Sequence, residues 1–109
     1  YEELYNDAAE KVDEVAERIL QLGSTPESRF SVYLQTAEIK EAGVVSCSKE
    51  ALDLLLDYYK TLIARERRII DLATEAHDDT TVSLVSDFLK EQEKTVWMLV
   101  AVSSQSCAE

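Results

Sequence analysis

Glycine and proline are nearly absent from the sequence, which contains two glycines and one proline among 109 residues. Because both residues interrupt helices, their scarcity favours long helices joined by few turns. Long hydrophobic runs are also missing, and no stretch approaches the roughly 20 apolar residues that a membrane-spanning helix needs. The length suits a single domain over residues 1–109, although such a domain has a small core for a chain that folds alone.

Cysteine occurs only twice, as Cys47 and Cys107, and these positions do not form a C-x-x-C metal motif. Two free thiols in a reducing, cytoplasmic compartment are favoured over one disulfide. Positive charge is scarce too, because 22 Asp and Glu outnumber 11 Lys and Arg and leave a net charge of −11. Nucleic-acid phosphates need clustered positive charge, so this balance argues against unaided DNA binding and favours cations as ligands.

The first long segment of helical hydrophobic spacing runs from Tyr1 to about Leu22. Gly23 follows where a helix C-cap is expected, and Pro26 prevents continuation. In the long connection that follows, residues 30–34 predict a short helix and residues 42–44 a loop.

Two further long helices are predicted in the second half of the chain. Ser48 is the expected N-cap of one, and a break at residues 77–80 precedes the other, which Asp78 or Asp79 is expected to cap. The last helix is expected to end in the polar tail 103–109. Within the first of these helices, Glu66 lies in the apolar arc among Arg65, Arg67 and Arg68, which predicts an ion pair.

The chain opens at Tyr1 without an initiator methionine or a capping Ser, Thr, Asp or Asn, so its first helix is expected to be entered part-way. Three long helices do not close a bundle, and a fourth helix upstream is the simplest completion. The sequence therefore predicts an all-α four-helix bundle, amino-terminally truncated, with the short helix between the second and third helices of the complete fold.

Three carboxylates, Glu2, Asp13 and Glu17, lie along one border of the apolar arc of the first helix, with Asn6 between them. Asp13 and Glu17 are four residues apart, so both can reach one cation from adjacent turns. Glu2 lies roughly 16 Å from Asp13 at the helical rise, and an antiparallel two-fold pairing would bring it to a partner's pair. The alternative is a solvated face, or acids paired with Lys11 and Arg18.

Three motifs resemble the Dps family of mini-ferritins in order and spacing across nearly the whole chain. The first is Asp13-x-x-x-Glu17-Arg18 followed by Leu22-Gly23-x-x-Pro26, similar to the second helix of that family. The others are the acidic turn at residues 76–81 and the closing-helix segment at residues 91–99.

The resemblance implies a ferritin-like fold and an iron site shared between subunits. Asp13 and Glu17 match the two carboxylate ligands of one subunit, and Glu2 matches the carboxylate of the other, where many relatives have Asp. The two histidine ligands of the family lie upstream of Tyr1 and are absent here, and His77 lies in a loop and is no substitute.

The resemblance further implies a ferroxidase that oxidises Fe(II), preferably with hydrogen peroxide, and stores ferric mineral in a dodecameric shell, protecting the cell from oxidative stress. The alternatives are a DNA-coating protein of the nucleoid and a structural shell that has lost catalysis. DNA coating in the family is attributed to lysine-rich tails, and residues 103–109 contain no lysine.

An iron-entry pore is a further implication, because acidic rings at three-fold axes attract cations. Asp78 and Asp79 at the start of the last helix, with Asp87 and Glu91 along it, are the candidates. Ser83 stands where relatives often have an acid. A solvated helix face is the alternative for these four residues.

Overall fold

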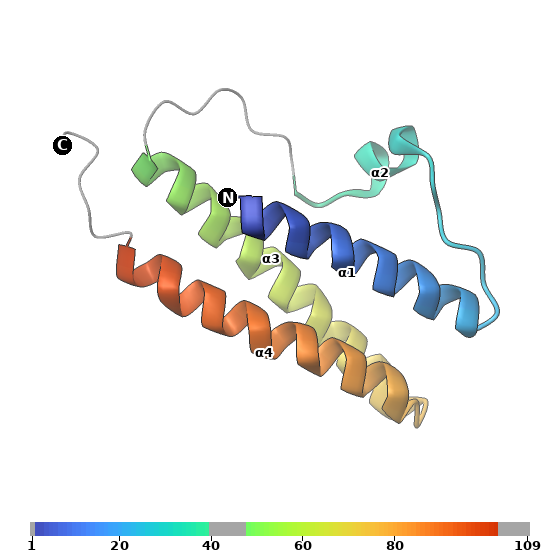
Figure 1. The fold of residues 1–109 in the computed structure, drawn as a ribbon. Helices are drawn as coiled ribbons and strands as arrows, with labels where there is room; N and C mark the ends of the chain where they lie inside the picture. The colour runs from blue at the N-terminus through green and yellow to red at the C-terminus, as the bar shows by residue number, and fades with distance from the viewer. Residues whose placement is uncertain (1, 40–47, 103–109) are drawn as a thin grey trace. The chain divides into compact units, whose positions relative to one another are not determined.

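A computed structural model describes residues 2–39 and 48–102 of the chain, and this part contains four α-helices and no strand (Figure 1). The predicted all-α class is therefore confirmed. The chain divides into two compact units, Tyr1–Ala37 and Glu38–Glu109. Among the described helices, none is both long and apolar enough to cross a bilayer. The loop expected at residues 42–44, both cysteines and the tail 103–109 lie outside the described residues.

Helix α1, Glu2–Gln21, is the first element of unit 1 and has the predicted extent. Its C-terminus is closed by Gly23, whose φ of 89° lies in the left-handed region that glycine adopts without strain. The Gly23 N–H donates to the Leu20 carbonyl at 3.0 Å, and the Ser24 N–H donates to the Ile19 carbonyl at 3.0 Å. These two bonds are the Schellman pattern, so the glycine ends α1 as the sequence predicted.

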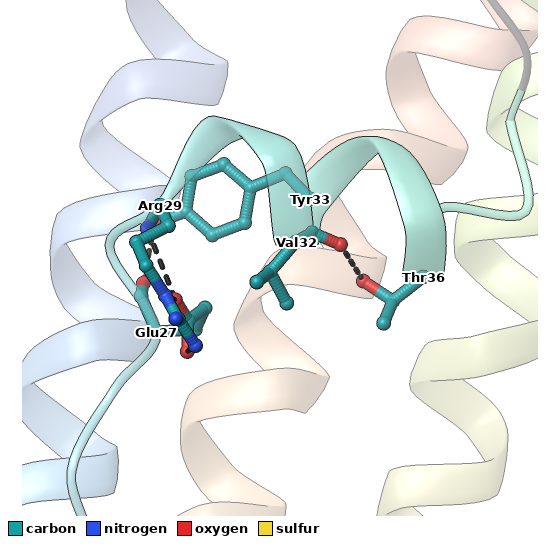
Figure 2. A network of polar contacts seen from close by, with 5 residues as sticks. All are labelled: Glu27, Arg29, Val32, Tyr33 and Thr36. Carbon is teal, nitrogen blue, oxygen red and sulfur yellow. Dashed lines mark hydrogen bonds and ion pairs between the residues drawn. The ribbon is translucent and has the colours of Figure 1, made fainter.

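Helix α2, Phe30–Thr36, begins where predicted but ends two residues later. Figure 2 shows the polar contacts that surround it. The Arg29 side chain donates to Glu27 Oε1 at 2.6 Å, and the Tyr33 hydroxyl donates to the Glu27 backbone carbonyl. At the other end, the Thr36 hydroxyl donates to the Val32 carbonyl at 2.8 Å. All these bonds are local in sequence: the Glu27 contacts lie before and within the first turn of α2, and the Thr36 bond lies in its last turn.

Unit 2 is built on a helical hairpin of α3, Ser48–Glu75, and α4, Asp79–Val102, which pack against each other. Ser48, expected as an N-cap, is the first residue of α3. The hairpin turn places His77 at φ 57°, a left-handed conformation rare for residues other than glycine. The His77 N–H donates to Thr74 and the Asp78 N–H to Ala73, so this turn repeats the bonding pattern at Gly23.

Asp78 is the N-cap of α4. Its Oδ1 accepts the Thr81 backbone N–H at 3.1 Å, and its Oδ2 accepts the Thr81 hydroxyl at 2.5 Å. Of the two candidates, Asp78 therefore has the capping role, because Asp79 is already the first residue of the helix. The cap satisfies a backbone N–H that has no partner within the helix.

The buried side of α4 follows a regular helical spacing, with Thr81, Val85, Phe88 and Gln92 all under 9% exposed. Tyr59 and Ala73 are the buried residues of α3. Across the hairpin, Arg67 Nη2 lies 3.9 Å from Glu93 Oε1 on the outer side. Gln92 was not singled out by its sequence pattern, although it is 4% exposed and its buried Oε1 accepts no hydrogen bond from the described residues.

Candidate metal centre

The three acids of the predicted border, Glu2, Asp13 and Glu17, all lie on α1 and are exposed to solvent. No side-chain hydrogen bond or ion pair joins any of the three carboxylates to another described residue. Because Asp13 and Glu17 are four residues apart, their carboxylates project from adjacent turns of the same face. The structure therefore leaves both side chains available for an external cation.

The basic neighbours of these acids have other contacts. Lys11 Nζ lies 2.8 Å from both carboxylate oxygens of Asp7, and Arg18 Nη1 donates to Gln21 Oε1 at 3.1 Å. The alternative in which Lys11 and Arg18 neutralise Asp13 and Glu17 therefore finds no support in the described contacts. Acidic residues outnumber basic ones along α1, which favours the approach of cations.

One chain brings only part of this set together. Asp13 and Glu17 share a face within one turn, whereas eleven residues separate Glu2 from Asp13, roughly 16 Å along a helix. Within the described residues, no three side chains of His, Cys, Asp or Glu converge as a metal site. Two carboxylates supply at most four oxygen donors, fewer than the six or more that hard cations take.

The four candidate pore residues lie at the start and along the outer side of α4. Asp79, Asp87 and Glu91 are exposed, whereas Asp78 is partly buried and uses both carboxylate oxygens to cap the helix. Asp78 therefore has a structural role that its acidic neighbours do not share. Asp87 and Glu91 are four residues apart, which gives them the same face of α4.

A groove of mixed charge in unit 2 was not anticipated from the sequence. It is lined by Glu38, Asp57, Lys60, Thr61, Ala64, Arg65 and Arg68. Arg65 forms an ion pair with Glu38 in this groove, so these two charges neutralise each other. The α3 residues among them recur at helical spacing on the polar side of the helix, and this pattern could have indicated the groove from the sequence. Their mixed charge does not point to a particular reaction.

Comparison with known proteins gives matches over most of the chain. Residues 1–105 match the family described as the ferritin-like domain. A DNA protection during starvation protein of Porphyromonas gingivalis is 50% identical over 105 residues, which are 96% of this chain and 66% of that protein. DNA protection during starvation protein 2 of Bacillus anthracis is 30% identical, covering 96% of this chain and 72% of its own length.

Solved structures agree with these sequence matches. The Dps protein of Vibrio cholerae, described as a member of a broad superfamily of ferritin-like diiron-carboxylate proteins, is 44% identical with a TM-score of 0.89. The match covers 92% of this chain and 63% of that one. Dps from Bacillus brevis is 33% identical with a TM-score of 0.89, over 93% of this chain and 68% of that one. The chain thus spans about two thirds of the length of these relatives.

Proposed function

The chain belongs to the ferritin-like family and, within it, to the Dps proteins, and from that premise we propose that this protein oxidises ferrous iron and stores the ferric product inside a hollow shell. The observation that most supports this proposal is a set of three exposed carboxylates on α1 that have no side-chain partner among the described residues. Glu2, Asp13 and Glu17 stand at the positions where the family resemblance assigns iron ligands, and no described basic side chain neutralises them.

Asp13 and Glu17 bind the ferrous substrate from one subunit, and Glu2 completes the site from the partner. This division follows from the roughly 16 Å between Glu2 and Asp13, because an antiparallel two-fold pairing of α1 removes that separation. Carboxylate oxygens suit hard cations, and nitrogen ligands from histidine would add selectivity for iron. The described part of unit 1 contains no histidine, and His77 lies in the turn between α3 and α4 of unit 2.

Hydrogen peroxide is the preferred oxidant in this proposal. Each of two ferrous ions gives up one electron, and one peroxide accepts both as its O–O bond breaks. With two further waters, the products are two ferric oxyhydroxide units and four protons, so atoms and charge balance. Because no one-electron reduction of peroxide occurs, hydroxyl radical is not released. Protection from oxidative stress in the cytoplasm follows.

The shell is proposed to be a dodecamer, and iron enters it through acidic openings. Asp79, Asp87 and Glu91 are the residues of α4 that line such a pore in the proposal, because negative side chains at a narrow opening concentrate cations. Asp78 contributes mainly by fixing the start of α4, on which Asp79 lies.

The test is anaerobic loading with ferrous iron, followed by peroxide, while ferric absorbance is recorded. Replacing both Asp13 and Glu17 with alanine should slow the oxidation at least about tenfold, since losing metal ligands costs more than losing their supporting residues. The matched control replaces Glu10 and Glu14 with alanine, which removes two exposed acids with the same spacing from the same helix. Equal oxidation rates in the two variants would show that Asp13 and Glu17 do not form the iron site.

Coating of DNA is the second candidate, and the observation that favours it is the name of the relatives, which refers to DNA protection. The net charge of −11 and the lack of lysine in residues 103–109 oppose it. Retarded migration of DNA with this protein at low salt, lost on raising the salt, would support the second candidate. An assembled protein that neither oxidises iron nor binds DNA would be a structural shell.

A further inference from the structure

The proposed two-fold pairing of α1 has a definite register, and this inference rests on the proposed function. For Glu2 to reach both ligands of the partner subunit, it must lie level with position 15, midway between Asp13 and Glu17. The two-fold axis then crosses the helices between positions 8 and 9. At the helical rise, the two symmetry-related sites lie roughly 20 Å apart along the pair.

The same register brings together exposed apolar residues that played no part in choosing it. Tyr5, which is 76% exposed, lies level with Val12 of the partner subunit, which is 63% exposed in the single chain. Ala9, less than one residue from the axis level, is exposed and small enough for two helix backbones to approach closely. Burial of Tyr5 and Val12 against each other at both ends of the axis would stabilise the pairing that completes the metal site.

Asn6 is the polar residue that this register brings to the site. It lies level with position 11 of the partner subunit, so about 3 Å along the axis separates it from the partner's Asp13. The partner's Glu17 is about 9 Å away on the same scale. Asn6 is exposed on the acidic border, and its side chain forms no hydrogen bond with any described residue.

We propose that Asn6 is a positioning residue, whose side-chain amide N–H donates a hydrogen bond to the carboxylate of the partner's Asp13. A carboxylate has two oxygens, and a donor held on one of them orients the other toward the cation. Supporting contacts of this kind around metal ligands fix their orientation and typically change metal affinity about 10-fold to 100-fold when removed. The amide is neutral, so it supplies this contact without adding repulsion between the carboxylates.

Binding of Co²⁺ to the assembled protein, followed by its visible absorption, tests this role with a readout that is independent of iron oxidation. Asn6→Ala should weaken Co²⁺ binding at least about 10-fold and alter the absorption band, because the Asp13 carboxylate loses its fixed orientation. Gln35→Ala is the control, since it removes an exposed amide from α2, which contains none of the proposed ligands, and it should change neither property.

The Asn6→Asp variant distinguishes a residue that donates a hydrogen bond to Asp13 from one that binds the cation directly. An aspartate at this position cannot donate to the Asp13 carboxylate when ionised, so Co²⁺ binding should weaken as in Asn6→Ala. Tighter binding in Asn6→Asp would overturn the donor role and make position 6 a direct ligand. Unchanged binding in Asn6→Ala, with binding lost in the Asp13→Ala, Glu17→Ala variant, would overturn the role of Asn6 and leave the proposed function standing. Binding unaffected in that double variant would overturn the proposed function itself.

Discussion

Replacing His77 with glycine should stabilise the protein, although the substitution removes a whole side chain. His77 holds a φ of 57°, which costs residues other than glycine about 1–2 kcal/mol. Glycine relieves that strain but gives the unfolded chain more freedom, which costs about 0.5–1 kcal/mol. The expected gain in the free energy of unfolding is therefore about 0.5–1 kcal/mol.

Gly23 provides the reciprocal experiment, because α1 ends with the same pair of backbone hydrogen bonds at a φ of 89°. A Cβ added there would meet no atom within 4 Å, so the cost of Gly23→Ala is conformational and not steric. The expected loss in the free energy of unfolding is about 0.5–1 kcal/mol, from the same two opposing quantities. The two substitutions should thus shift stability by similar amounts in opposite directions.

Urea unfolding followed by circular dichroism measures both changes, at one fixed subunit concentration because assembly makes stability concentration-dependent. The double variant should return to nearly the original midpoint, since the two turns are far apart in sequence and each is closed by hydrogen bonds within its own segment. Shifts of the same sign for His77→Gly and Gly23→Ala would refute the reasoning from left-handed backbone conformation.

Three further predictions concern polar side chains. Asp78→Ala should lower the free energy of unfolding by about 1–2 kcal/mol through loss of the α4 cap, whereas Asp79→Ala should change it much less, as urea titrations will report. Gln92→Leu should raise it by about 1 kcal/mol, because Gln92 Oε1 is buried without a partner among the described residues, and a lower urea midpoint would contradict this. The hydrogen bonds from the Arg29 side chain and backbone lower the pKa of Glu27 below its ordinary 4.5. The stabilisation that these bonds give is therefore fully present above pH 4.5 and is lost as the pH falls through the lowered pKa of the folded state. Chemical shifts of α2 amides should report this loss below pH 4.5, and Glu27→Gln should remove it.

The helices were predictable because their boundaries are marked by local chemistry. Gly23 and Pro26 ended α1, and the acids after His77 marked the start of α4. The end of α2 was missed by two residues, because the prediction followed the amphipathic stretch 30–34, whereas the polar residues Gln35 and Thr36 continue the helix. The break at residues 77–80 was predicted, but the spacing of residues could not reveal that His77 adopts a left-handed conformation within it.

The candidate site could be predicted only in part from the sequence, because its proposed residues come from two subunits. Asp13 and Glu17 share one face of one helix, so spacing alone brings them together. In the proposed pairing, Glu2 and Asn6 reach the same site only through a second copy of α1, and the spacing of residues in one chain does not reveal such a pairing. Gln92 was missed because polar residues are expected on the surface. It lies four residues after Phe88, on the same face of α4, and only the structure shows that both side chains are buried.

The most direct test of the central claim is to locate iron in crystals of the assembled protein soaked anaerobically with ferrous ion, using anomalous scattering at the iron edge. The account predicts a peak bounded by Asp13 and Glu17 of one subunit and by the partner's Glu2, repeated about 20 Å away across the two-fold axis. Iron bound elsewhere, with Asp13 and Glu17 exposed to solvent and unoccupied, would contradict the account.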